Sequence, residues 1–376
     1  MATPPARTIP VRTIHVRLPG EATDRSYEIA CGSGLIDSVG GRVAADGARR
    51  AVVIADAAVA GSHAARVAAS LAAAGAATTT LEVPSGESSK GVPMAGRLWA
   101  ELAALAADRG TQIVAVGGGV VGDLAGFVAA TFARGLPVWH VPTTLVAQVD
   151  SAIGGKTGIN LEAGKNLVGA FWQPRGVVAD IDTLATLPDR EYISGLAEVV
   201  KYGMILDASF FAWLEGHAAE LLAREPQALA WAVERSASLK AQVVEQDERE
   251  VSGLRAALNY GHTFGHAYET AAGYGRLLHG EAVAIGMARA ARLAATLGRL
   301  DEAVVGRQDR LLASLQLPTT PAAAGAIEPA TLITIMGRDK KSLHGRLRFV
   351  LPDAIGRVEL VEGVDPAAVE RVLSAP

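Results

Sequence analysis

Three histidines and one glutamate form the pattern in this sequence with the clearest chemical meaning. His262 and His266 are four residues apart in LNYGHTFGHAYE, so a helix would present both on one face. His279 follows in LHGEA at the expected start of another helix, and Glu198 lies in GLAEVVKYG. Two imidazoles and one carboxylate suit a divalent cation. The spacing leaves open which two histidines would bind it, and a purely structural trio is the alternative.

A lysine accompanies the glutamate. Lys201 lies three residues after Glu198, so both fall on one face of a largely apolar helix. A simple ion pair is the alternative to a role in chemistry. We expect the remaining histidines to be surface or core residues: His15, His63, His140, His217 and His344.

A glycine-rich segment, GGGVVGD, follows a predicted strand and precedes a predicted helix. It fits G-x-G-x-x-G, in which glycines let backbone amides approach a pyrophosphate at a helix N-terminus. A structural turn is the alternative, and the motif follows a later strand rather than the first. The candidate contacts in this segment are Gly119, Val120, Val121, Gly122 and Asp123.

Polar residues also follow four predicted strands. Asp56 ends AVVIAD, where a carboxylate could accept both ribose hydroxyls or could merely cap a helix. The turn SGESSK could hold a nucleotide or cap a helix, and threonines end two further strands. Four such loops predict one shared ligand. The candidates are Asp56, Ser85, Gly86, Glu87, Ser88, Ser89, Lys90, Thr143, Thr144, Thr183, Leu184, Ala185 and Thr186.

Cationic residues point to an anionic substrate. We interpret VDSAIGGKTGIN and GKNLVGAFWQP as two glycine-rich loops whose lysines could hold a phosphate, with solvated turns as the alternative. Further basic residues would neutralise carboxylate and phosphate groups if they converge. The candidates in these segments are Asp150, Lys156, Asn160, Lys165, Asn166, Lys240, Arg255, Arg338, Lys340 and Lys341.

Composition limits the class of protein. The chain has 376 residues, which favours two domains, and 50% hydrophobic with 20% charged residues excludes disorder. A net charge of −4 and 5% aromatic residues argue against nucleic acid as a partner. Apolar stretches are too short to cross a membrane, and no targeting segment is visible. The single cysteine, Cys31, suits a reducing compartment, so we expect the cytoplasm.

Periodicity predicts an α/β fold. Short β-branched runs at residues 51–55, 79–83, 112–116, 138–141 and 177–181 alternate with helical stretches, which indicates a largely parallel sheet preceded by strands at 13–18 and 27–30. Residues 190–204, 226–246, 258–272 and 282–297 are typical of helices, and 346–351 with 357–361 of a hairpin. We therefore expect a Rossmann-like dinucleotide-binding domain over residues 1–188 and a mainly α-helical metal- and substrate-binding domain over 189–376.

Seven segments together resemble one family. GGGVVGDLAGFVAATFARG, VPTTLVAQVDSAIGGKTGIN, GKNLVGAFWQP, DTLATLP, GLAEVVKYG, LNYGHTFGHAYE and LHGEAVAIGM are similar to the 3-dehydroquinate synthase family of sugar phosphate cyclases. The similarity runs in order from about residue 56 to residue 351. Any one segment would be only suggestive, but seven in order are highly specific.

The resemblance implies a reaction and its cofactors. Members convert 3-deoxy-D-arabino-heptulosonate 7-phosphate into 3-dehydroquinate and phosphate in the shikimate pathway. The implied course is transient oxidation by a retained NAD+, phosphate elimination, re-reduction and intramolecular aldol closure. A zinc or cobalt ion would be bound by Glu198, His262 and His279.

The resemblance also implies residue roles. His266 matches a contact to substrate or phosphate, and Arg134 matches a residue contributed across a homodimer interface. The implied substrate contacts are Asp150, Lys156, Asn166, Lys201, Lys240, Arg255, Asn259 and either Lys340 or Lys341. The implied NAD contacts are Asp56, Glu87, Lys90, Gly119, Val120, Val121, Gly122, Asp123, Thr143, Thr144, Lys156, Lys165, Thr183, Leu184, Ala185 and Thr186.

Three other classes of protein would share parts of this pattern. Another sugar phosphate cyclase would share the NAD and metal apparatus but need not bind a carboxylate, whereas Arg255, Lys240 and Asn259 suit one. A metal-dependent NAD alcohol dehydrogenase would not need the lysine and arginine set. A non-catalytic NAD sensor would have lost a metal ligand or Lys201, and all are retained.

Overall fold

The computed structural model describes residues 9–19, 24–273, 275–325, 327–338 and 347–375. The chain divides into two compact units, one of residues 1–187 with 229–249 and the other of residues 188–228 with 250–376. Most of helix α9 (Pro226–Gln246) therefore clusters with the first unit, although it lies in the second half of the sequence. The binding roles expected for residues 1–188 and 189–376 stay a prediction.

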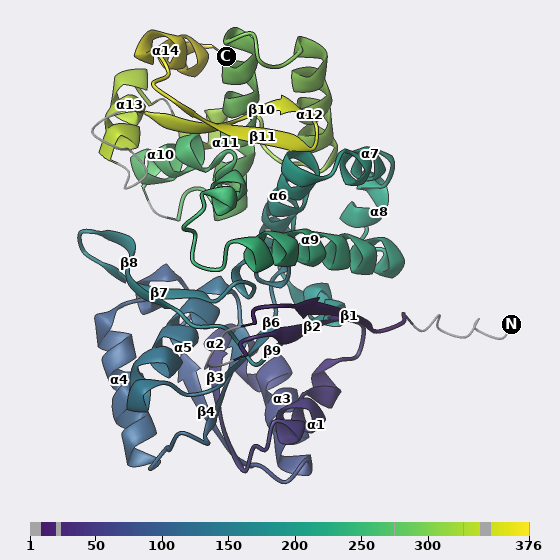
Figure 1. Ribbon diagram of the computed structural model, residues 1–376, viewed down its shortest axis with the longest axis vertical. Coiled ribbons are helices and arrows are strands. Elements are labelled where there is room, and N and C mark those ends of the chain that lie inside the picture. The colour runs from purple at the N-terminus through teal and green to yellow at the C-terminus, as the bar shows by residue number, and fades with distance from the viewer. Residues whose placement is uncertain (1–8, 20–23, 274, 326, 339–346, 376) are drawn as a thin grey trace, which may run out of the picture. The chain divides into compact units, whose positions relative to one another are not determined.

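A seven-stranded sheet forms the centre of the first unit, in the order β1-β2-β9-β6-β5-β3-β4 (Figure 1). Every neighbouring pair is parallel except β1–β2, so the predicted parallel sheet is confirmed. The strands are β1 (Arg12–Val16), β2 (Tyr27–Gly32), β3 (Arg50–Asp56), β4 (Ala77–Val83), β5 (Gln112–Gly117), β6 (Val138–Pro142) and β9 (Gly176–Asp180).

Helices cover both faces of this sheet, because its central strands are apolar on both sides. Along β3, Val53 packs into a core with Leu71 of α3, whereas Ile54 packs into a second core with Leu98 of α4. The helical segments of this unit, besides α9, are η1 (Ile36–Ser38), α1 (Val39–Ala45), α2 (Ala57–Val59), η2 (Ala60–Ala64), α3 (Ala65–Ala73), η3 (Glu87–Ser89), α4 (Val92–Ala104), α5 (Gly119–Thr131), η4 (Phe132–Arg134), η5 (Ala147–Ser151) and η6 (Ile181–Thr186).

The two predicted lysine-bearing loops are in fact a hairpin, so that prediction was wrong. Strands β7 (Lys156–Leu161) and β8 (Gly164–Phe171) pair antiparallel, with Gly158 opposite Gly169. A Cβ at Gly169 would lie 2.3 Å from the Thr157 carbonyl oxygen, so no side chain fits there. The glycines that suggested loops are what let the two strands approach.

The second unit is mainly helical, as predicted. Its helices are α6 (Asp189–Leu206), α7 (Ala208–Gly216), α8 (Ala218–Leu222), η7 (Leu254–Asn259), α10 (His262–Ala272), α11 (His279–Thr296), α12 (Glu302–Ser314), η8 (Pro321–Ala324), α13 (Pro329–Arg338) and α14 (Pro366–Ser374). The expected late hairpin is β10 (Arg348–Ala354) with β11 (Arg357–Glu362). The helix expected over 258–272 begins only at His262, because Gly261 has a left-handed φ of 77°. Among the described residues, no helix is long and apolar enough to cross a membrane.

Helices α10 and α11 pack backbone to backbone. A Cβ at Gly286 of α11 would lie 1.9 Å from the Gly261 carbonyl oxygen, and one at Gly265 of α10 would lie 2.9 Å from the Ala282 carbonyl oxygen. Both distances are shorter than the closest approach of a nonbonded carbon and oxygen. Glycine is therefore required where these two helices meet.

Gly286→Ala should lower the free energy of unfolding by about 1–3 kcal/mol or more, since the added methyl group forces α10 away from α11. Gly96→Ala is the matched control, because Gly96 lies within α4 and a Cβ added there would have no neighbour within 4 Å. This control should stabilise the protein by about 0.5–1 kcal/mol. Urea unfolding of both variants measures the difference, and equal effects would contradict the close packing.

Candidate functional site

Glu198, His262 and His279 come together in the second unit. Each offers one ligand atom, and these atoms all lie within 4.8 Å of one another. Glu198 projects from α6, while the two histidines are the first residues of α10 and α11. Glu198 Oε1 lies 3.3 Å from His279 Nε2 and 3.7 Å from His262 Nε2. The fold thus selects His262 and His279, a choice that sequence spacing left open.

Neighbouring groups orient these side chains. His262 Nδ1 lies 3.0 Å from the Tyr260 carbonyl oxygen, so Nδ1 carries the hydrogen and Nε2 is left to bind an ion. The Tyr260 hydroxyl in turn donates to Gln308 Oε1 at 2.6 Å. His266 lies one turn further along α10, with its ring centroid 5.4 Å from that of His262.

The charges at this cluster favour a bound cation. Glu198 is fully buried, and its Oε2 forms an ion pair with Lys201, which is also buried. Burial by itself lowers the pKa of His279, but the hydrogen bond and negative charge of Glu198 raise it, and the net direction is upward. Two imidazole nitrogens and one carboxylate oxygen make a donor set that fits a divalent ion with an open coordination position.

Two more candidates lie close to α6. Arg255 and Asn259 belong to η7, which packs against α6 and β11. Arg255 is only 2% exposed, so its guanidinium is a buried cation. Lys340, Lys341 and His344 lie outside the described residues, so the predictions made for them stay predictions.

The glycine-rich segment lies at the carboxyl end of β5 in the first unit. Helix α5 begins at Gly119, four residues before Asp123, and places its free backbone amides at the end of the sheet. A Cβ at Gly117 would lie 3.1 Å from Asp56 Cβ, and one at Gly119 would lie 2.9 Å from Ser151 Oγ. Side chains at these two glycines would therefore collide with neighbouring segments. Glycine also leaves the backbone amides of this turn accessible to a ligand.

The polar candidates at the ends of β3 and β4 contact one another. The Asp56 carboxylate caps α2 by accepting from the Ala58 amide at 2.9 Å and also accepts from the Ser85 hydroxyl. Lys90 Nζ lies 2.5 Å from Asp123 Oδ2. Burial raises the pKa of Asp123 and the Lys90 charge opposes this, with a net upward direction.

The same edge continues through the hairpin and the two threonine loops. Asn160 Nδ2 of β7 donates to Glu87 Oε1 at 2.8 Å. Thr143 and Thr183 are buried at the ends of β6 and β9, and Thr144 Oγ1 accepts from the Ala147 amide at 3.3 Å. Of the predicted nucleotide contacts, Gly86, Ser88, Val120, Val121, Gly122, Leu184 and Ala185 also lie on these loops or on the first turns of α5 and η6.

Sequence reasoning missed one partner of this edge. His63, expected to be an ordinary surface or core residue, places Nε2 2.9 Å from Thr186 Oγ1. The two residues are 123 positions apart, so no local pattern could have connected them.

The remaining candidates lie on α9, η5, β7, β8 and η4 of the first unit. Lys240 of α9 donates to the Asp150 carbonyl oxygen at 2.7 Å and forms an ion pair with its carboxylate. Lys156 begins β7, while Lys165 and Asn166 lie on β8. Arg134 is exposed at the end of η4, where both it and Ala133 have left-handed φ values of 67° and 50°. Two such residues in succession are strained, as at many functional sites.

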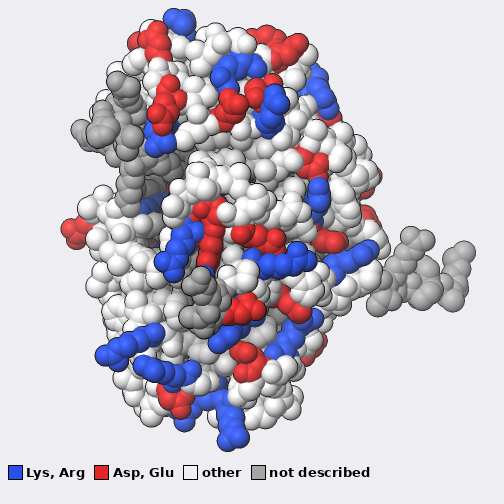
Figure 2. Space-filling model, in the orientation of Figure 1, with Lys and Arg blue, Asp and Glu red and all other residues white. Residues whose placement is uncertain are grey.

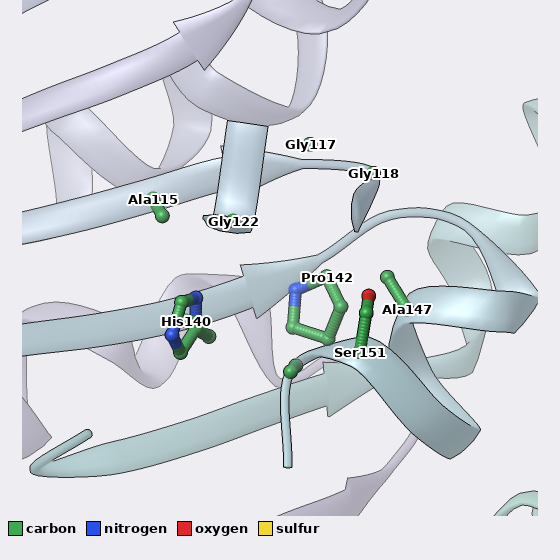
Figure 3. A pocket seen from close by; sticks show the side chains of 9 residues that line it. Ala115, Gly117, Gly118, Gly122, His140, Pro142, Ala147 and Ser151 are labelled. Atoms are coloured by element: carbon green, nitrogen blue, oxygen red, sulfur yellow. The ribbon is translucent and has the colours of Figure 1, made fainter. Parts of the chain in front are cut away.

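A small pocket of about 10 Å³ lies beneath the glycine-rich turn (Figure 3). It is lined by Ala115, Gly117, Gly118, Gly122, His140, Pro142, Ala147, Ser151 and Ala152. His140 is 5% exposed, and burial lowers its pKa to about 4. Its ring therefore stays neutral in the folded protein at neutral pH.

The surface in Figure 2 carries cationic and anionic side chains near one another, in keeping with the net charge of −4.

The lowered pKa of His140 predicts sensitivity to acid. The unfolded chain takes up a proton near the ordinary pKa of 6.5, whereas the folded chain does so only near 4, so stability falls as the pH drops through this window. Relative to His140→Gln, the natural protein should lose roughly 2 to 3 kcal/mol between pH 7 and pH 4.5. Urea unfolding at the two pH values tests this, and an identical pH dependence in both proteins would refute it.

Comparisons with known proteins agree with this geometry. The family models described as 3-dehydroquinate synthase N-terminal and C-terminal match residues 80–194 and 195–342. The 3-dehydroquinate synthase of Rhodopirellula baltica is 48% identical over 375 residues, covering 98% of this chain and 97% of that protein. That of Geobacter metallireducens is 50% identical over 340 residues, covering 90% and 93%.

Solved structures show the same fold. A 2-deoxy-scyllo-inosose synthase complexed with carbaglucose-6-phosphate, NAD+ and Co2+ has a TM-score of 0.84 at 28% identity, covering 97% of this chain and 99% of that one. ValA, a 2-epi-5-epi-valiolone synthase from Streptomyces hygroscopicus with NAD+ and Zn2+ bound, has a TM-score of 0.84 at 29% identity, covering 95% and 98%. The chain is 48% identical to a curated relative over nearly its full length, and both family models match it in order. It therefore belongs to the 3-dehydroquinate synthase family.

Proposed function

We propose that this chain is a 3-dehydroquinate synthase, which converts 3-deoxy-D-arabino-heptulosonate 7-phosphate into 3-dehydroquinate and phosphate. The observation that carries the proposal is the cluster of Glu198, His262 and His279, whose ligand atoms lie within 4.8 Å of one another. This cluster occurs in a chain 48% identical over nearly its full length to a curated 3-dehydroquinate synthase. The reaction has no net redox change, because the hydride removed from substrate is returned.

Two cofactors follow from the residues and the relatives. Glu198, His262 and His279 would hold one zinc or cobalt ion, and the edge formed by the ends of β3 to β6 and β9 would hold NAD+. When bound, the ion acts as a Lewis acid that lowers the pKa of a substrate hydroxyl, and NAD+ accepts and returns a hydride. Solved relatives at 28% and 29% identity are described with NAD+ and with Co2+ or Zn2+.

The chain's own groups prepare the metal site. Lys201 offsets part of the charge of the buried Glu198 carboxylate, while the Tyr260 carbonyl keeps His262 Nε2 directed at that carboxylate. Both effects fix the ligands before an ion arrives. Removing either neighbour would leave a ligand free to rotate or a buried charge uncompensated.

Other groups bind and orient the substrate. The buried Arg255 guanidinium suits bidentate recognition of the substrate carboxylate. We assign substrate contacts also to Asp150, Lys156, Asn166, Lys201, Lys240, Asn259, His266 and one of Lys340 or Lys341. Lysine and histidine side chains hold the phosphate group, which itself takes up the proton as it leaves, and the later aldol closure needs mainly a held conformer.

We further propose a cytoplasmic homodimer in which Arg134 reaches the partner's substrate. Exposure of Arg134 and the strained backbone that fixes its direction support this role. The free and buried Cys31 suits a reducing compartment.

A different sugar phosphate cyclase is the second candidate. The relevant solved structures, a 2-deoxy-scyllo-inosose synthase and ValA, match with a TM-score of 0.84 but at 28% and 29% identity, well below the 48% of the curated 3-dehydroquinate synthase. A buried Arg255 also favours a substrate with a carboxylate. The probable glycerol dehydrogenase of Sinorhizobium meliloti, at 19% identity and a TM-score of 0.59, shares the fold alone.

One assay tests the proposed function. Purified protein with NAD+, Co2+ or Zn2+ and the heptulosonate phosphate should release phosphate and 3-dehydroquinate in equal amounts.

His279→Ala should lower the rate of phosphate release at least about 100-fold while leaving NAD+ affinity nearly intact, because it removes a metal ligand. His217→Ala, a partly exposed histidine between α7 and α8, is the matched control. Failure of the natural protein to form 3-dehydroquinate sinks the function, whereas unchanged phosphate release by His279→Ala sinks only the metal assignment.

Arg255→Ala should raise the KM for the heptulosonate phosphate by about 10- to 100-fold, since it removes a charged hydrogen-bond partner of the carboxylate. Arg255→Lys keeps the charge but not the planar fork, so it should recover only part of the loss. Steady-state kinetics give kcat and KM separately, and thermal melting controls for loss of a buried side chain. An unchanged KM in a folded Arg255→Ala protein would contradict the assignment.

A further inference from the structure

We propose that Gln148 is a positioning residue for NAD+ binding, because it fixes the ends of β6 and β9 relative to each other. The inference rests on the NAD+ site of the proposed function. Gln148 lies in η5 and is fully buried. None of the roles assigned above includes this residue.

The side-chain amide of Gln148 joins three segments. Its Nε2 donates to the Asp180 carbonyl oxygen at 2.9 Å, to Thr183 Oγ1 at 3.1 Å and to the Pro142 carbonyl oxygen at 3.2 Å. Pro142 and Asp180 are the last residues of β6 and β9, and Thr183 lies in η6. One nitrogen therefore contacts both strand ends and the loop that follows β9.

This contact lies where the backbone pairing of the two strands has stopped. Strands β6 and β9 pair only at Trp139 with Gly176 and at His140 with Val177. Beyond these pairs, Pro142 and Asp180 are linked through Gln148 instead. The amide thus continues, through a side chain, a connection that the sheet no longer makes.

The residues held in this way are the proposed nucleotide contacts. Thr143 and Thr144 directly follow Pro142, and the backbone amide of Gln148 donates to the Thr144 carbonyl oxygen at 3.0 Å. Thr183 also donates to the Asp180 carbonyl oxygen at 2.7 Å. Because both loops depend on one buried amide, its loss should alter the distance between them and weaken NAD+ binding. Residues far from the two loops should be affected less.

Gln112 provides a matched control. It is also a buried glutamine of the same sheet, 3% exposed, but it begins β5 and so lies at the opposite end of that strand from Gly117. Gln112→Met and Gln148→Met each replace a buried amide by an apolar side chain of similar size. Only the second removes a link between nucleotide-binding loops.

The experiment measures NAD+ affinity by calorimetry on the metal-free protein, with Co2+ affinity by chelator competition as an internal control. Gln148→Met should raise the Kd for NAD+ at least about tenfold, whereas Gln112→Met should change it less than about twofold. Co2+ affinity should stay within about twofold of the natural protein in both variants.

Gln148→Glu supplies a second readout. An ionised carboxylate offers no donor to the two carbonyl oxygens, while a protonated one offers a single donor. The NAD+ affinity of Gln148→Glu, taken relative to the natural protein, should therefore improve as the pH is lowered from 8 to 6. The Co2+ affinity of this variant, taken relative to the natural protein, should not follow the same dependence, whereas a merely structural role would change both affinities. The variant also serves if Gln148→Met fails to fold.

The outcomes separate the two ideas. If the natural protein does not bind NAD+, the proposed nucleotide site is wrong and this inference is overturned with it. If the natural protein binds NAD+ while folded Gln148 variants bind it within twofold, with no pH-dependent recovery, only the positioning role of Gln148 is overturned.

Discussion

The buried negative charge of Glu198 is the constraint around which the second unit is organised. A carboxylate without solvent is costly unless cations face it. Lys201 meets one oxygen, and His262 and His279 lie beside the other. Removing any of these neighbours would leave the carboxylate with fewer polar partners, so the need to compensate one buried charge brings three helices together.

Helix termini and Glu198 together set the charge that the two histidine rings carry. His262 and His279 are the first residues of α10 and α11, where the positive end of a helix disfavours an additional positive charge on the ring. Glu198 acts in the opposite sense on His279, whose pKa is raised overall. A bound metal ion needs both imidazoles neutral, which the helix starts favour, and it gives the Glu198 carboxylate a second cationic partner beside Lys201. The close glycine contacts between α10 and α11 keep the two rings in range.

Much of this architecture follows from local pattern, and the rest depends on contacts between distant residues. Apolar runs predicted the parallel strands correctly because β3, β5, β6 and β9 are buried on both faces. The hairpin of β7 and β8 was missed because its glycines resemble those of loops until the partner strand is known. Likewise, the choice of His262 and His279 over His266 depends on where α6 places Glu198, which spacing within one helix cannot show.

The nucleotide edge illustrates the same limit and suggests how it functions. Asp56 contacts Ser85, Lys90 contacts Asp123 and Glu87 contacts Asn160, so polar groups from separate loops are already tied to one another. Such ties reduce the conformational entropy that a ligand must remove on binding, although some of these hydrogen bonds must then be shared with it. Gln148 adds a connection of this kind below the surface, between strand ends that the backbone leaves unpaired. In the sequence it stands between the apolar residues Ala147 and Val149, within a buried segment. Its importance arises only when the carbonyl groups of two strands converge on it.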